Sequence, residues 1–224
     1  MNTFYKLLII LSFICRCNCV SFSMQPENFT RYGLVDVTTC DTTFVVALMY
    51  ASTDNFVGEN MYGELNKAYL HRDAASALKK ASTYLHEIYP GYNLKICDAA
   101  RPMSVQTRMF NSVKGTPKAR YVANPSKGGG LHNYGLAVDI TIVDENGDEL
   151  PMGTKVDHLG VEANIDKEQV LVRQGVITQT EADNRMLLRN IMKRAGFRPL
   201  PTEWWHFNFC TLSHARKYYK RLDF

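Results

Sequence analysis

Two short motifs far apart in the chain limit the folds that it can adopt. The first is GLHNYGLAVD, from Gly130 to Asp139, and the second is EWWH at residues 203–206. Asp139 stands between Val138 and Ile140 in a stretch that is otherwise apolar. A carboxylate buried in such a stretch must be paired or must bind a metal ion. We therefore expect a fold that brings the two motifs together around buried polar groups.

The side chains in the two motifs match the ligand set of a catalytic zinc ion. His132, Asp139 and His206 supply two imidazoles and a carboxylate. Catalytic zinc sites have three protein ligands and keep the fourth position for water. One zinc ion per chain is the expected cofactor, and these three residues are its expected ligands.

Glu203 is the expected general base, because a hydrolytic zinc site needs a group that takes a proton from the attacking water. Residues three apart in a strand point to opposite faces of the sheet. Glu203 and His206 can therefore converge only if Glu203 lies in the loop before the strand. Pro199 and Pro201 favour that arrangement, because both interrupt a regular ladder.

Arg101 is the next candidate, since it stands where a predicted strand ends and a helix begins at Pro102. Its guanidinium could stabilise the oxyanion that develops when water attacks an amide carbonyl. Trp204 and Trp205 are expected to form walls of the site and to keep water sparse.

Hydrophobic periodicity predicts a mixture of helices and strands without a βαβ repeat. Helices are expected over 71–89, from 102 to 110, and after the capping box at 178–181; strands are expected over 44–50, 94–97, 136–143 and 204–209. In the first helix, Leu78, Ala81, Leu85 and Ile88 form one apolar stripe. The expected fold class is α+β, a single domain with a mainly antiparallel central sheet flanked by helices.

Length and composition agree with one globular domain. The chain has 224 residues, 46% of them hydrophobic, and a net charge of +4. No linker-like segment divides it. Because the basic residues are spread along the chain, nucleic-acid binding is not expected.

Residues 1–23 have the pattern of a signal peptide. Lys6 precedes an apolar run from Leu7 to Ile14, which is shorter than the ~20 residues of a membrane span. We expect this segment to direct export, to the periplasm, and residues 24–224 to form the catalytic domain, with no membrane span. A buried N-terminal strand is the alternative. Lipid anchoring at a cysteine of this segment is a further alternative with weak support, because none of these cysteines follows a small residue.

Three cysteines, Cys40, Cys97 and Cys210, follow the expected signal peptide. An odd number allows at most one disulfide and leaves one thiol free. None of the three has the spacing of a thiolate metal site. We interpret them mainly as small buried hydrophobic residues.

The two motifs resemble those of the zinc D-Ala-D-Ala peptidases, Ser-x-His-x-x-Gly-x-Ala-x-Asp and Glu-x-Trp-His. The matching residues are His132, Gly135, Ala137, Asp139, Glu203, Trp205 and His206. The segments 50–58, 98–102 and 152–157 are similar to the D-alanyl-D-alanine dipeptidase branch, which includes the vancomycin-resistance dipeptidase. The resemblance covers roughly residues 35–209.

This resemblance implies one zinc held by His132, Asp139 and His206, Glu203 as the catalytic base, and Arg101 as the group that stabilises the transition state. It implies hydrolysis of the D-Ala-D-Ala dipeptide as the activity. Gly130 departs from the family pattern, which has Ser at this position. If that Ser helps to hold substrate, then either a backbone N–H replaces it or the substrate preference has changed.

A free dipeptide also carries an ammonium group that needs a partner. Asp157, in the Met-Gly-Thr-x-x-Asp segment, is our hypothesis for that partner. Two alternatives share the metal motifs. One is a D,D- or L,D-carboxypeptidase that trims peptidoglycan stem peptides, and the other is a non-catalytic zinc domain that binds cell-wall peptides. The presence of Glu203 argues against the non-catalytic domain.

Overall fold

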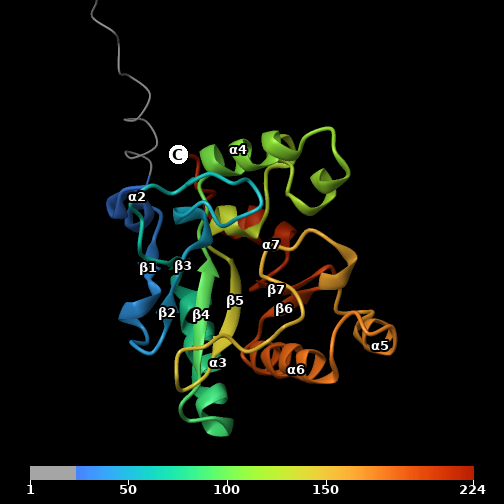
Figure 1. The fold of residues 1–224 in the computed structure, drawn as a ribbon. Coiled ribbons are helices and arrows are strands. Elements are labelled where there is room, and N and C mark those ends of the chain that lie inside the picture. Colours follow the sequence, from blue (N-terminus) through green and yellow to red (C-terminus); the bar gives the residue numbers. More distant parts are fainter. Residues whose placement is uncertain (1–23) are drawn as a thin grey trace, which may run out of the picture.

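The computed structural model describes residues 24–224 (Figure 1). The expected signal peptide, residues 1–23, lies outside the described part of the chain. None of the helices formed by residues 24–224 combines the length and the apolar composition needed to cross a bilayer.

A five-stranded sheet forms the centre of the fold, in the order β2-β4-β5-β7-β6. Its strands are β2 (Val45–Val46), β4 (Asn93–Asp98), β5 (Ala137–Val143), β7 (Glu203–Asn208) and β6 (Arg198–Leu200). Only the β2–β4 pair is parallel. A separate two-stranded antiparallel sheet joins β1 (Leu34–Asp36) to β3 (Tyr69–His71). The predicted α+β class with a mainly antiparallel central sheet is confirmed.

Helices surround the central sheet (Figure 1). They are α2 (Pro26–Arg31), α3 (Arg72–Ile88), α4 (Met103–Val113), α5 (Glu168–Arg173), α6 (Gln179–Arg194) and α7 (Leu212–Tyr218). The long helices α3 and α6 pack against each other, α3 also against β4, and α6 also against β6 and β7. Short 3-10 turns connect these elements at Val37–Thr39, Met49–Ala51, Pro117–Tyr121, Pro125–Lys127, Leu131–Tyr134 and Val161–Ala163.

Strand β5 is the centre of the core, and all of its residues are buried. This burial explains its nearly continuous apolar sequence, since a strand covered on both faces has no solvent side to alternate with. Asp139 and Thr141 are the polar exceptions within β5.

The capping box predicted for α6 is present. The Thr178 hydroxyl accepts a hydrogen bond from the backbone N–H of Glu181, and the Glu181 carboxylate accepts one from the backbone N–H of Thr178. Gly196 follows the helix in the left-handed conformation at φ 98°, which suits a residue without a β-carbon.

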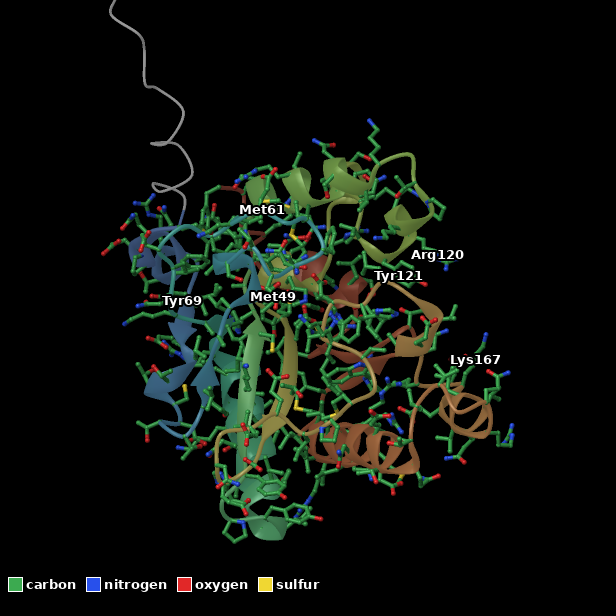
Figure 2. The ribbon with its side chains drawn as sticks, viewed as in Figure 1. Met49, Met61, Tyr69, Arg120, Tyr121 and Lys167 are labelled. Carbon is green, nitrogen blue, oxygen red and sulfur yellow. The ribbon has the colours of Figure 1, made fainter. Side chains whose placement is uncertain are left out.

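Two predictions about local structure were wrong in detail. The apolar run at 44–50 pairs with β4 only at Val45 and Val46, because the chain then turns at Met49–Ala51 and buries Tyr50. Figure 2 shows Met49 near the end of β4 in this view. In α3, Leu78, Ala81 and Leu85 are buried, but Ile88 is 52% exposed because it lies in the last turn, beyond the packed part of the helix.

The three cysteines of the described residues are all free thiols. Cys97 is buried, and burial raises the pKa of its thiol. Cys40 and Cys210 are only half-buried, so the interpretation as buried hydrophobic residues holds for Cys97 alone.

Candidate functional site

The structure brings His132, Asp139 and His206 together although they lie on three different elements. Nε2 of His132 is 3.2 Å from Nδ1 of His206. Oδ1 of Asp139 is 2.9 Å from the same His206 nitrogen and 3.4 Å from Nε2 of His132. Three donor atoms therefore form a small triangle, and all three residues are buried.

The dimensions of this triangle fit a metal ion. Ligand atoms bound at about 2.0–2.1 Å to a tetrahedral zinc are roughly 3.3 Å from one another. Two imidazole nitrogens and a carboxylate oxygen are also ligand types that zinc accepts. His132, Asp139 and His206 thus form a candidate metal site.

In each histidine ring, the nitrogen that points away from the triangle lies close to a hydrogen-bond acceptor. Nδ1 of His132 is 2.6 Å from the carbonyl oxygen of Ala99, and Nε2 of His206 is 2.9 Å from Oδ1 of Asn208. A ring nitrogen that donates to such an acceptor carries the proton, so the other nitrogen keeps its lone pair for the metal. Both rings are therefore oriented with one nitrogen toward the triangle, as metal ligands require.

The electrostatics of the triangle favour a charged pair. Burial opposes ionisation of Asp139, but the two histidines outweigh it and hold the pKa of this carboxyl well below its ordinary value. Burial also opposes protonation of His206, yet the hydrogen bond and the charge of Asp139 raise its pKa to about 9. The site is thus built around a carboxylate anion, which a bound cation would also stabilise.

His132 is positioned by a tight turn, Leu131–Tyr134, that ends at Gly135 with φ 64°. A β-carbon at residue 135 would lie 2.7 Å from the side chain of Leu34. Glycine is therefore required here both for the left-handed backbone and for space. The turn folds His132 back toward Asp139 on β5.

Glu203 is the first residue of β7, and it does not lie in a preceding loop as we predicted. Its Oε2 is nevertheless 3.9 Å from Nδ1 of His206. The reason is an irregular register, since Leu200 of β6 pairs with Glu203 whereas Pro199, its neighbour, pairs with Phe207. The additional β7 residues between these pairs interrupt the regular ladder, and such an interruption changes the direction of side chains.

The carboxyl group of Glu203 is almost completely enclosed. Burial raises its pKa to about 7, and the negative charges of Asp139 and Asp157 act in the same direction, while His206 opposes them. A carboxyl group with a pKa near neutrality can both accept and release a proton at neutral pH.

Arg101 lies between β4 and α4, as predicted, and its side chain is buried. Its guanidinium donates from Nε and Nη2 to Asp98 and from Nη1 to Gln106. Nη2 also lies 4.0 Å from Oδ2 of Asp139. Because a guanidinium has five N–H donors and three form these bonds, two remain for a ligand in the site.

Asp157 reaches the same cavity from a loop between β5 and α5. Its carboxylate accepts hydrogen bonds from the Tyr50 hydroxyl at 2.9 Å and from the backbone N–H of Phe56 at 3.3 Å. Asp157 has φ 70°, a positive value that no other non-glycine residue among 24–224 shows. Burial raises the pKa of this carboxyl to about 6, and the charge of Asp139 acts in the same direction.

One cavity of about 360 Å³ lies beside the candidate metal site. Its wall contains the three candidate ligands and also Glu203, Arg101 and Asp157, together with apolar residues such as Leu200 and Leu212. Tyr121, labelled in Figure 2, belongs to the wall that comes from the segment after α4. A cavity of this kind encloses a small ligand and offers it a few convergent polar groups.

Two sequence expectations about the cavity wall need revision. Trp205 lines the cavity, but Trp204 does not, because its indole N–H donates to the Thr154 hydroxyl instead. Gly130 does line the cavity, yet its backbone N–H donates to Oδ1 of Asn133 at 2.8 Å. That N–H is therefore engaged within the turn and is not available to replace a serine hydroxyl.

Sequence reasoning missed the residues that support the site. Asn133 is completely buried, and its amide donates to the carbonyl of Arg101 at 2.8 Å. Asp98 is also completely buried and accepts a hydrogen bond of 2.6 Å from Tyr62. For Asp98 a signal existed, because an aspartate at the end of an apolar strand and three residues before an arginine can pair with it. Nothing comparable marked Asn133 or Asn208.

Comparisons with known proteins find similarity to peptidases. The family model described as D-Ala-D-Ala dipeptidase, of peptidase family M15, matches residues 30–222. A D-alanyl-D-alanine dipeptidase of Escherichia coli (strain K12) is 32% identical over 174 residues, which cover 78% of this chain and 83% of the relative. One from Enterococcus faecalis (strain ATCC 700802 / V583) is 27% identical over 190 residues, covering 76% and 88%. A solved LD-carboxypeptidase, LdcB, matches 66% of this chain and 63% of its own, with 22% identity and a TM-score of 0.40.

We predict that Asn208→Ala weakens zinc binding roughly 10- to 100-fold, because it removes the acceptor that orients His206. Competition with a chromophoric chelator would measure the affinity. Asn190→Ala is the matched control, since Asn190 is exposed on α6 and away from the cavity. Equal zinc affinity of the Asn208 variant and the control would show that this hydrogen bond does not support the ligand.

Proposed function

The chain belongs to the D-Ala-D-Ala dipeptidase family of M15 metallopeptidases, and from this premise we propose that it hydrolyses the D-Ala-D-Ala dipeptide to two D-alanines with one bound zinc ion. The observation that carries the proposal is the triangle of His132, Asp139 and His206 with the carboxylate of Glu203 beside it. Metal ligands alone would serve a binding domain, whereas an adjacent buried carboxyl group supplies the proton transfer that hydrolysis needs.

A zinc ion held by the three ligands supplies Lewis-acid chemistry, in that it makes water acidic near neutral pH and polarises a carbonyl oxygen. Glu203 takes the proton of the attacking water on its carboxylate. It then passes that proton to the nitrogen of the leaving D-alanine. Its pKa of about 7 suits both steps at neutral pH.

Arg101 stabilises the negative charge that develops on the scissile carbonyl oxygen. Asp98 and Gln106 hold the guanidinium in place before substrate binds. A donor that is already oriented costs little reorganisation during the reaction, which is the basis of oxyanion stabilisation. The two N–H groups that those partners leave free are the ones we assign to this role.

Asp157 binds the ammonium group of the dipeptide. With a pKa of about 6 it is mainly ionised at neutral pH. Tyr50 and the backbone of Phe56 fix its orientation. An anion at this point favours a substrate whose amino group is free.

The zinc-loaded protein should therefore hydrolyse D-Ala-D-Ala. Glu203→Gln should lower kcat about 10²- to 10⁴-fold, because the amide cannot take a proton from water. The same variant should keep its zinc, because Glu203 is outside the ligand triangle. D-alanine release and metal content, measured on the same samples, provide the two readings.

A pentapeptide that ends in D-Ala-D-Ala is the control substrate for this experiment. Faster cleavage of the pentapeptide than of the dipeptide would favour a carboxypeptidase instead. Zinc binding without any hydrolysis would favour a peptide-binding domain.

The role of Asp157 predicts that Asp157→Asn raises KM for D-Ala-D-Ala roughly 10- to 100-fold, since a hydrogen-bonded charge pair is lost. Asparagine tolerates a positive φ better than alanine does, so the backbone should be retained. Steady-state kinetics and zinc affinity would be measured together. Asp54→Asn is the control, because Asp54 is an exposed residue paired with Lys155 outside the cavity. An unchanged KM would remove Asp157 from the substrate site.

We also propose that residues 1–23 direct export to the periplasm and that residues 24–224 form the catalytic domain. The short apolar run behind Lys6 supports this proposal. Expression of the whole chain in a bacterial host, followed by fractionation and N-terminal sequencing, should find a shortened chain in the periplasmic fraction. A full-length chain retained in the cytoplasm would contradict it.

A further inference from the structure

Arg198 is a cation of the cavity wall to which the proposed mechanism gives no role. Apart from the two histidines, the only cationic side chains that line the cavity are Arg101 and Arg198, counted over the described residues. Arg101 is already paired with Asp98. Arg198 is exposed, and its side chain has no hydrogen-bond or ion-pair partner among residues 24–224.

The register of the sheet places Arg198 close to the candidate metal site. Arg198 on β6 pairs with Asn208 on β7, and cross-strand partners project from the same face of a sheet. Asn208 in turn is hydrogen-bonded to the ring of His206. One side chain therefore separates Arg198 from a metal ligand.

Asp157 and Arg198 approach the cavity from different edges of the central sheet. The partners of Asp157 are Tyr50 and Phe56, which follow the edge strand β2, whereas Arg198 belongs to the opposite edge strand β6. The ligand triangle lies between these edges, on β5, β7 and the turn before β5. Asp157 thus brings a carboxylate to the cavity from the side of β2, and Arg198 brings a guanidinium from the side of β6.

We propose that Arg198 binds the C-terminal carboxylate of the substrate. A guanidinium matches a carboxylate with two parallel hydrogen bonds, which gives direction as well as attraction. The assignment rests on the proposed function, because it takes a short peptide with its scissile bond at the metal site. Together Asp157 and Arg198 select peptides in which both termini are free and one residue lies on each side of that bond.

The test compares D-Ala-D-Ala with its C-terminal amide, which lacks the negative charge. In the wild-type protein the acid should have the lower KM. Arg198→Met should raise KM for the acid about tenfold, with kcat within twofold, and should leave KM for the amide unchanged. Arg198→Lys should recover part of the effect. Arg173→Met is the control, since Arg173 is exposed on α5 and does not line the cavity.

A binding experiment separates failure of this inference from failure of the proposed function. D-Ala-D-Ala is titrated calorimetrically into zinc-loaded Glu203→Gln protein and into the same protein with Arg198→Met added. Weaker binding to the double variant supports the carboxylate contact even if the wild-type protein shows no turnover. Equal binding, no binding to either protein, or an unchanged ratio of the acid and amide KM values would overturn the inference. Absence of wild-type turnover alone would count only against the proposed function.

Discussion

The antiparallel pairing of β4, β5 and β7 is the constraint on which the site depends. Asp98 pairs with Asp139, and Asp139 pairs with His206, so one row across three strands carries three polar side chains. Directly paired residues share a face of the sheet. A slip of one residue in the pairing of β5 with β7 would send a candidate ligand to the opposite face. The burial of every residue of β5 opposes such a slip, because it would also displace the apolar side chains of the core.

Buried charge is stabilised here by a network of compensating partners. Asp98 neutralises Arg101 and accepts a hydrogen bond from Tyr62, while Asn133 links the turn that carries His132 to the backbone of Arg101. Each of these groups would be costly to bury alone. Because the network satisfies them together, it also holds Arg101 and His132 in one geometry. Rigidity of this kind is what a metal site and an oxyanion donor both need.

The cavity combines this rigid centre with a carboxylate, Asp157, from one edge of the sheet and a guanidinium, Arg198, from the other. Asp157 retains a left-handed backbone, which is unfavourable for a residue other than glycine. Tyr50 and Phe56 hold its carboxylate in return. A strained backbone conformation persists only where surrounding contacts enforce it. Here it points the carboxylate of Asp157 into the cavity that also contains the candidate metal site. The arrangement suits a small zwitterion better than a long chain.

Several features of the fold and of the candidate site follow from short stretches of sequence. The capping box at Thr178 and Glu181 and the ligand types at the two motifs could be predicted, because each depends on residues close together in the chain. We expected Glu203 and His206 to converge because Glu203 would lie in a loop before the strand. In the structure both residues belong to β7, and their approach accompanies an irregular register against β6. The exposure of Ile88, the position of Trp204 outside the cavity and the support from Asn208 could not be predicted. These features depend on which distant segments pack together, and only the tertiary structure decides that.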